Sequence, residues 1–220
     1  MVNARFDPLL VAGTLLYIPL LFLALRVLSH LRPLSPFAQR KLVHVGIGVG
    51  TIVATALFAQ RGWALVAPCL FVAANAAGLP ARLAPALGRS GRDPALWMFP
   101  LCVVALYLLY WDELHRGPVL AGLCALGLAD PAAAVVGRRL GERRFAGWGH
   151  GRSLEGSLAF LLVTAVASGA VALAVPGALP ALRLAVGCGA AGALVEAISP
   201  TGVDNLTAPI AVAAAFRALA

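Results

Sequence analysis

The chain has 220 residues, of which 61% are hydrophobic and 12% are charged, and its formal net charge is +8. Soluble domains contain about 45–50% apolar and about 25% charged residues, so a soluble chain of this composition would expose large apolar patches. The composition therefore excludes an ordinary soluble domain, a disordered chain and a nucleic-acid-binding module, and it predicts an integral membrane protein.

Seven apolar segments are long enough to cross the hydrocarbon core of a bilayer, which takes about 20 helical residues. They are residues 9–28, 42–60, 63–79, 95–111, 118–136, 154–175 and 182–199. An eighth segment, 206–220, is short for a span, and the sequence leaves open whether it crosses fully. The expected fold is an all-α, polytopic integral membrane bundle of seven to eight transmembrane helices. Residues 1–220 are expected to form a single domain.

The basic residues divide unequally between the two sides of this predicted bundle. Twelve of the 17 Lys and Arg residues flank the first, third and fifth connections: Arg26, Arg32, Arg40, Lys41, Arg82, Arg89, Arg92, Arg138, Arg139, Arg143, Arg144 and Arg152. Cytoplasmic loops carry an excess of Lys and Arg, so these connections are expected in the cytoplasm and the N-terminus outside. We expect the chain in the cytoplasmic membrane of a prokaryote.

Ionisable residues at membrane depth are costly and are functional-site candidates. The orientation, which depends on Lys and Arg alone, places six polar residues on the cytoplasmic face: His44, Asp130, Glu155, Glu196, Asp204 and Asn205. Structural explanations stay open for each, such as a kink at Pro131, ion pairs with arginines, or a cap for the last helix. Four other acidic residues are expected to be ordinary interfacial charges: Asp7, Asp112, Glu113 and Glu142.

The fifth connection, residues 137–157, combines five arginines with closely spaced glycines and leads into a helix. Ser153 is a credible N-cap, which would direct free backbone N–H groups toward the loop. A glycine-rich cationic loop at a helix N-terminus suits polyphosphate binding, although the loop contains no Walker A motif. Binding of anionic lipid head groups would explain the charge but not the glycines.

Carboxylates beside a phosphate site suggest Mg²⁺, which is commonly held by a few carboxylate oxygens together with substrate phosphates. Phosphoryl transfer needs mainly positioning and charge neutralisation. A nucleotide from the cytoplasm and an acceptor dissolved in the bilayer would meet at this depth. The residues therefore predict a membrane-embedded phosphotransferase that acts on a lipid.

Four blocks, in chain order, resemble the CTP-dependent lipid-alcohol kinases, a family that comprises dolichol/polyprenol kinases and phytol kinases. The family patterns are RKxxH, GDxxAxxxGxxxG, KSxEGSxAF and ExxSPxGxDNL, and they are similar to residues 40–44, 129–141, 152–160 and 196–206. The chain departs from them at Ala129, where Gly is usual, and at Arg152, where Lys is usual. It also lacks an expected Glu in the third connection.

The resemblance implies CTP as phosphate donor, Mg²⁺, and an isoprenoid lipid alcohol as acceptor, with membrane lipids as further partners. It implies catalytic roles for Asp130, Glu155, His44 and Lys41. It implies nucleotide contacts for Arg40, Arg138, Arg152, Ser153, Gly156, Asp204 and Asn205, and metal contacts for Asp130, Glu155 and Glu196. Two alternatives stay open: a CTP-using cytidylyltransferase that makes a CDP-linked lipid, and a non-enzymatic protein that binds anionic lipids.

Overall fold

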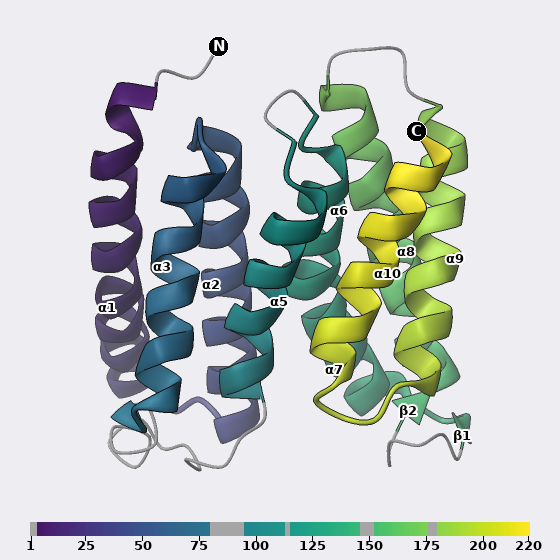
Figure 1. Ribbon diagram of the computed structural model, residues 1–220. Coiled ribbons are helices and arrows are strands. Elements are labelled where there is room, and N and C mark those ends of the chain that lie inside the picture. Colours follow the sequence, from purple (N-terminus) through teal and green to yellow (C-terminus); the bar gives the residue numbers. More distant parts are fainter. Residues whose placement is uncertain (1–3, 80–94, 113–114, 146–151, 176–179) are drawn as a thin grey trace.

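The structure is a computed structural model that describes residues 4–79, 95–112, 115–145, 152–175 and 180–220. It is helical except for one antiparallel two-stranded hairpin, which confirms the all-α prediction (Figure 1). The elements are α1 (Asp7–Leu31), α2 (Pro36–Leu57), α3 (Arg61–Ala76), α5 (Ala95–Tyr110), α6 (Gly117–Cys124), α7 (Asp130–Leu140), β1 (Arg144–Phe145), β2 (Arg152–Ser153), α8 (Leu154–Ala174), α9 (Ala181–Ile198) and α10 (Asp204–Leu219).

Five helical segments among the described residues are long and apolar enough to cross a membrane: Ala4–Leu31, Pro36–Leu57, Gly117–Leu140, Leu154–Ala174 and Ala181–Ile198. The predicted count of seven to eight spans is therefore not confirmed. Three further helices, α3, α5 and α10, have 16 residues each. At 1.5 Å per residue such a helix is about 24 Å long, which is shorter than the roughly 30 Å hydrocarbon core.

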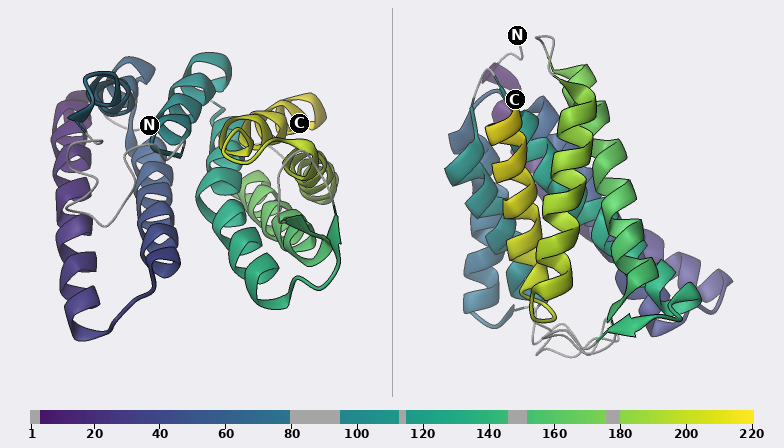
Figure 2. Two further views of the ribbon diagram at one scale, coloured as in Figure 1. Left: turned by 90° about the horizontal axis from the view of Figure 1, so that it is seen from below. Right: turned by 90° about the vertical axis from the view of Figure 1, so that its right-hand side faces the viewer.

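The central element of the bundle is a continuous rod made of α6, a π-helical segment (Ala125–Ala129) and α7. Its small residues let neighbouring backbones approach closely, as is common between membrane helices. The helices α1 to α3 lie on one side of this rod, and α8 to α10 lie on the other (Figure 2). Exposed leucines on the outer helices, such as Leu20, Leu158 and Leu182, suit contact with lipid.

Several polar segments gather at one end of the bundle, which we call the basic end. It comprises the α1–α2 connection, the first turns of α2, the end of α7, the β1–β2 hairpin and the α9–α10 turn (Figure 1). The described basic residues on these segments are Arg32, Arg40, Lys41, Arg138, Arg139, Arg143, Arg144 and Arg152. The predicted third-connection residues Arg82, Arg89 and Arg92 lie outside the described residues.

Candidate active site

The first polar cluster joins α2 to the beginning of α7. The Nζ atom of Lys41 lies 3.0 Å from Oδ2 of Asp130, and the two side chains are 20% and 21% exposed, so this ion pair is accessible at its edge. The Nε2 atom of His44 lies 3.7 Å from the same oxygen. Lys41 and His44 are three residues apart in one helix, so they lie on the same face.

Local sequence explains where α2 begins and why it presents these residues. Ser35 is the N-cap of α2, and its hydroxyl accepts a hydrogen bond from the backbone N–H of Ala38 at 3.2 Å. Pro36 occupies the first helical position, where its missing N–H costs nothing. Lys41 therefore lies at the start of the second turn, close to the basic end.

The second polar cluster ties β2 to the α9–α10 turn and is centred on Arg152. One guanidinium nitrogen of Arg152 donates to Glu196, and the other donates to Oδ2 of Asp204 at 2.8 Å and to the carbonyl of Ser199 at 3.0 Å. The hydroxyl of Ser157 donates to Oε2 of Glu196 at 3.0 Å. The side chains of Arg152, Glu196 and Asp204 are only 9%, 11% and 14% exposed, so the network is largely buried.

Asp204 also shapes the turn on which the second cluster depends. Its Oδ1 accepts hydrogen bonds from the backbone N–H groups of Gly202 at 2.8 Å and Asn205 at 2.9 Å. Gly202 has a φ of +93°, a backbone conformation that glycine adopts without strain. The Asp204 carboxylate therefore both organises the α9–α10 turn and binds Arg152.

The beginning of α8 packs closely against the end of α7. The hydroxyl of Ser153 accepts a hydrogen bond from the N–H of Gly156 at 3.1 Å, which confirms the predicted N-cap. A Cβ atom on Gly156 would lie 3.1 Å from the Ala133 carbonyl oxygen and 3.3 Å from the Gly137 Cα. Glycine at position 156 thus permits this helix contact, and its contact with nucleotide stays a prediction.

Glu155 lies beside the hairpin rather than in either cluster. Its Oε1 accepts a hydrogen bond from the backbone N–H of Arg143 at 3.3 Å. Its Oε2 is buried and has no hydrogen-bond partner among the described residues. Arg138 stacks over the ring of Phe37 with its guanidinium carbon 4.4 Å from the ring centroid, and Arg40 is exposed.

The predicted residues are thus divided among distinct surroundings. The structure brings together Lys41, His44 and Asp130 in one cluster, and Arg152, Glu196 and Asp204 in another. The three predicted metal carboxylates do not gather, and the described part of the chain contains no group of three or more His, Cys, Asp or Glu suited to a metal ion. Residues 146–151 of the predicted phosphate loop lie outside the described residues.

Sequence reasoning assigned no role to several groups that complete these clusters. Ser157 and the carbonyl of Ser199 bind members of the Arg152 network, and the carbonyl of Leu126 lies 2.8 Å from Nε2 of His44. Ser157 and Ser199 both fall inside family blocks, but Arg152 donates to the backbone carbonyl of Ser199, which no side-chain pattern indicates. Partners that come from distant helices, or that act through a backbone carbonyl, leave no local pattern in the sequence.

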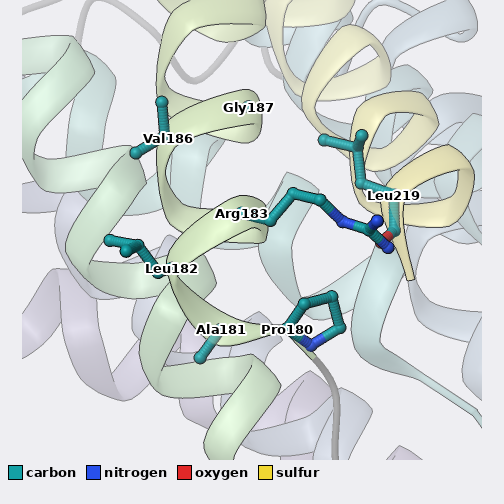
Figure 3. Close-up of a pocket in the computed structure, with 7 residues that line it drawn as sticks. All are labelled: Pro180, Ala181, Leu182, Arg183, Val186, Gly187 and Leu219. Carbon is teal, nitrogen blue, oxygen red and sulfur yellow. The ribbon is translucent and has the colours of Figure 1, made fainter.

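One hollow of about 680 Å³ lies at the other end of the bundle, between the start of α9 and the end of α10. Its lining is almost entirely apolar, and Arg183 reaches across it to donate to the carbonyl of Leu219 (Figure 3). This hollow lies at the end of the bundle opposite the α9–α10 turn (Figure 1), and none of its lining residues belongs to either polar cluster. It is therefore not part of the candidate active site.

The fold and the polar clusters define a helical membrane protein with its ionisable residues concentrated at one end. No family model matches the chain, and no solved structure matches it. A curated relative, the phytol kinase of Synechocystis sp. (strain PCC 6803), is 30% identical over 200 residues, which cover 88% of this chain and 84% of the relative. The chain belongs to the lipid-alcohol kinase family.

Proposed function

We propose that the protein transfers the γ-phosphate of CTP to an isoprenoid alcohol of the phytol or polyprenol type at the cytoplasmic face of the membrane. The observation that carries this proposal is the Lys41–Asp130 pair, which lies on membrane helices, is partly exposed and adjoins the basic end. A phosphate from the aqueous side and a hydroxyl from the lipid side can both reach such a position. The relationship to a phytol kinase supports the acceptor class at family level.

The proposed reaction forms a bond between the acceptor oxygen and the γ-phosphorus and breaks the bond between that phosphorus and the β–γ bridging oxygen, so CDP leaves. Catalysis of phosphoryl transfer depends mainly on positioning and on neutralising charge. In this scheme Asp130 orients the acceptor hydroxyl and accepts its proton. Lys41 holds Asp130 in place and stabilises negative charge on the transferred group.

Exposed arginines at the basic end are the proposed phosphate contacts, beside the capped N-terminus of α8. Arg40 and Arg138 are exposed, whereas both terminal nitrogens of Arg152 already donate to protein oxygens. We therefore assign the direct phosphate contacts to Arg40 and Arg138. The N–H groups of Leu154 and Gly156 at the start of α8 already donate to the Arg143 carbonyl and the Ser153 hydroxyl, so this helix end borders the phosphates. Arg152 and Asp204 hold β2, α9 and α10 together at the border of the nucleotide site, and Asn205 lies next to them in the chain.

Magnesium fits two of the three carboxylates proposed for it. Asp130 is partly exposed, and Glu155 has a carboxylate oxygen without a partner in the described part of the chain. Glu196 fits less well because Arg152 and Ser157 engage both of its oxygens. Since Mg²⁺ commonly uses one or two carboxylates plus substrate phosphates, either Asp130 or Glu155 would provide the protein ligand. The ion would neutralise negative charge on the β- and γ-phosphates.

The basic end is proposed to face the cytoplasm. Eight of the described Lys and Arg residues lie on the segments of this end, which agrees with the excess of positive charge in cytoplasmic loops. A reporter inserted between Arg139 and Arg143 tests this orientation, because it should be active only when cytoplasmic. Activity of a periplasmic reporter at this site would reverse the proposed topology.

The reaction is tested with purified protein in lipid nanodiscs containing phytol, geranylgeraniol, a polyprenol or diacylglycerol. CTP or ATP labelled at the γ-phosphate is added with Mg²⁺ or with a chelator, and labelled lipid is measured. We expect labelled phytol or polyprenol phosphate from CTP, dependent on Mg²⁺ and lost in Asp130→Asn. The absence of labelled lipid with every acceptor would contradict kinase activity. Transfer of an α-label with release of pyrophosphate would instead identify a cytidylyltransferase.

A further inference from the structure

The backbone immediately before Asp130 departs from regular α-helix. Residues Ala125–Ala129 are π-helical, and the N–H of Asp130 donates to the carbonyl of Ala125, five residues earlier, rather than to that of Leu126. Single π-helical turns inside α-helices are rare and are frequent at functional sites. Here the extra residue lies directly before the candidate catalytic carboxylate.

The π-helical turn leaves the carbonyl of Leu126 without a backbone partner in its own helix. Its α-helical partner would be the N–H of Asp130, which donates to Ala125 instead. Its π-helical partner would be residue 131, which is proline and has no N–H. A buried carbonyl that forms no hydrogen bond destabilises the folded state, so a donor from elsewhere is needed.

His44 supplies that donor from α2. Its Nε2 atom lies 2.8 Å from the Leu126 carbonyl oxygen, and because a carbonyl oxygen can only accept, Nε2 must carry the proton. The ring is further held by an edge-to-face contact with Phe99, with the ring centroids 5.1 Å apart. The same nitrogen is 3.7 Å from Oδ2 of Asp130, so its primary contact is with the carbonyl.

We infer that His44 is a positioning residue, which stabilises the π-helical turn through the Leu126 carbonyl and thereby sets the orientation of Asp130 toward Lys41. This inference rests on the proposed function for its effect on catalysis, but the hydrogen bond itself does not. This role requires only a hydrogen-bond donor at the position of His44 Nε2. It requires no exchange of protons with the substrate. That requirement separates it from a general base.

The amide-containing residues provide a matched set of variants, because the glutamine amide nitrogen can occupy the position of histidine Nε2 and the asparagine amide nitrogen cannot. We expect His44→Gln to keep most of the wild-type kcat. His44→Asn and His44→Phe should lower kcat by about tenfold, as loss of one buried hydrogen bond implies. The KM for nucleotide should stay the same in all three. A His44→Gln variant as inactive as His44→Phe would overturn the inference.

A second experiment uses Pro131 and does not depend on activity. Pro131→Ala restores a backbone N–H, so Leu126 can be satisfied within its own helix. We expect His44→Phe to lower the thermal unfolding temperature markedly in the wild-type background and at most half as much in the Pro131→Ala background. Equal losses in the two backgrounds would show that His44 does not serve this carbonyl, whether or not the protein phosphorylates a lipid.

The protonation state of the ring gives a direct readout on the whole protein. With ¹⁵N-labelled histidine in detergent micelles, the His44 signals can be assigned by their loss in His44→Gln. The inferred hydrogen bond predicts a proton on Nε2. A neutral ring protonated on Nδ1 would contradict the inference even if every activity measurement agreed with it.

Discussion

Gly48 of α2 and Gly127 of the π-helical segment pack backbone against backbone. A Cβ atom added at Gly48 would lie 2.5 Å from the Cα of Gly127, and one added at Gly127 would lie 2.7 Å from the Cα of Gly48. Real side chains essentially never approach backbone atoms so closely, so this crossing requires glycine on both helices. The crossing lies one turn from His44 and less than one turn from Asp130, and it therefore fixes the distance between α2 and the carboxylate.

Replacing Gly48 with alanine should push α2 away from the rod. The Lys41–Asp130 pair would lengthen, so we expect Gly48→Ala to lose most lipid phosphorylation and to lower the unfolding temperature. Gly13→Ala is the matched control, because no atom lies within 4 Å of a Cβ at that position of α1. In a helix this control should be neutral or stabilising by up to about 1 kcal/mol. Wild-type turnover by Gly48→Ala would show that the helix spacing is not critical.

Variants that break the Lys41–Asp130 pair are expected to lose catalytic activity while the protein stays folded. Both side chains are about one-fifth exposed, so removing one of them leaves a charge that water can still reach. We expect Asp130→Asn and Lys41→Met each to lower kcat at least a hundredfold while the unfolding temperature changes by only a few degrees. Such a loss corresponds to about 3 kcal/mol of transition-state stabilisation.

Asp112→Asn and Arg61→Met are the controls for charge removal, because both residues are exposed and lie away from the basic end. Both variants should retain wild-type turnover. Activity of Asp130→Asn comparable to that of Asp112→Asn would remove Asp130 from the proposed mechanism.

For variants of the Arg152 network we expect the opposite pattern, in which the main effect is a loss of thermal stability. Breaking one partner of a buried ion pair strands the other charge and typically costs about 3–5 kcal/mol. We therefore expect Glu196→Gln and Arg152→Met each to lower the unfolding temperature strongly. The double variant Arg152→Met/Glu196→Gln should be less destabilised than the sum of the two single variants. Thermal unfolding in detergent measures all three, with exposed Glu142→Gln as a neutral control.

The sequence predicted the helical class, the positions of the helices and the concentration of polar residues at one end. These features follow from composition and hydropathy, which are local properties. The sequence left open whether Glu196 binds a metal ion with Asp130 or pairs with an arginine, and in the structure it binds Arg152 and Ser157. That outcome depends on how α8, α9 and α10 pack, and small residues permit several packings. The π-helical turn was not predicted from the sequence either, because Pro131 by itself indicates only a kink.

Asp7 shows the same limitation at the other end of the bundle. It was expected to be an ordinary interfacial charge, and this expectation was wrong because its side chain is fully buried. Its two carboxylate oxygens accept hydrogen bonds from the backbone N–H groups of Ala59 at 2.9 Å and Gln60 at 3.0 Å. Asp7 thus binds the start of α1 to the turn between α2 and α3. Nothing in the residues around position 7 indicates a partner more than 50 positions away.

This contact yields a prediction that separates folding from catalysis. Asp7→Asn replaces one acceptor oxygen with an NH₂ group. That group faces a backbone N–H, so one buried hydrogen bond is lost and two hydrogen-bond donors point at each other. We expect a loss of about 1–3 kcal/mol in the free energy of unfolding. Because Asp7 lies at the end of the bundle away from Lys41 and Asp130, the KM values and the kcat of the folded fraction should match those of the wild type. A reduced kcat with unchanged stability would show instead that the two ends of the bundle are coupled.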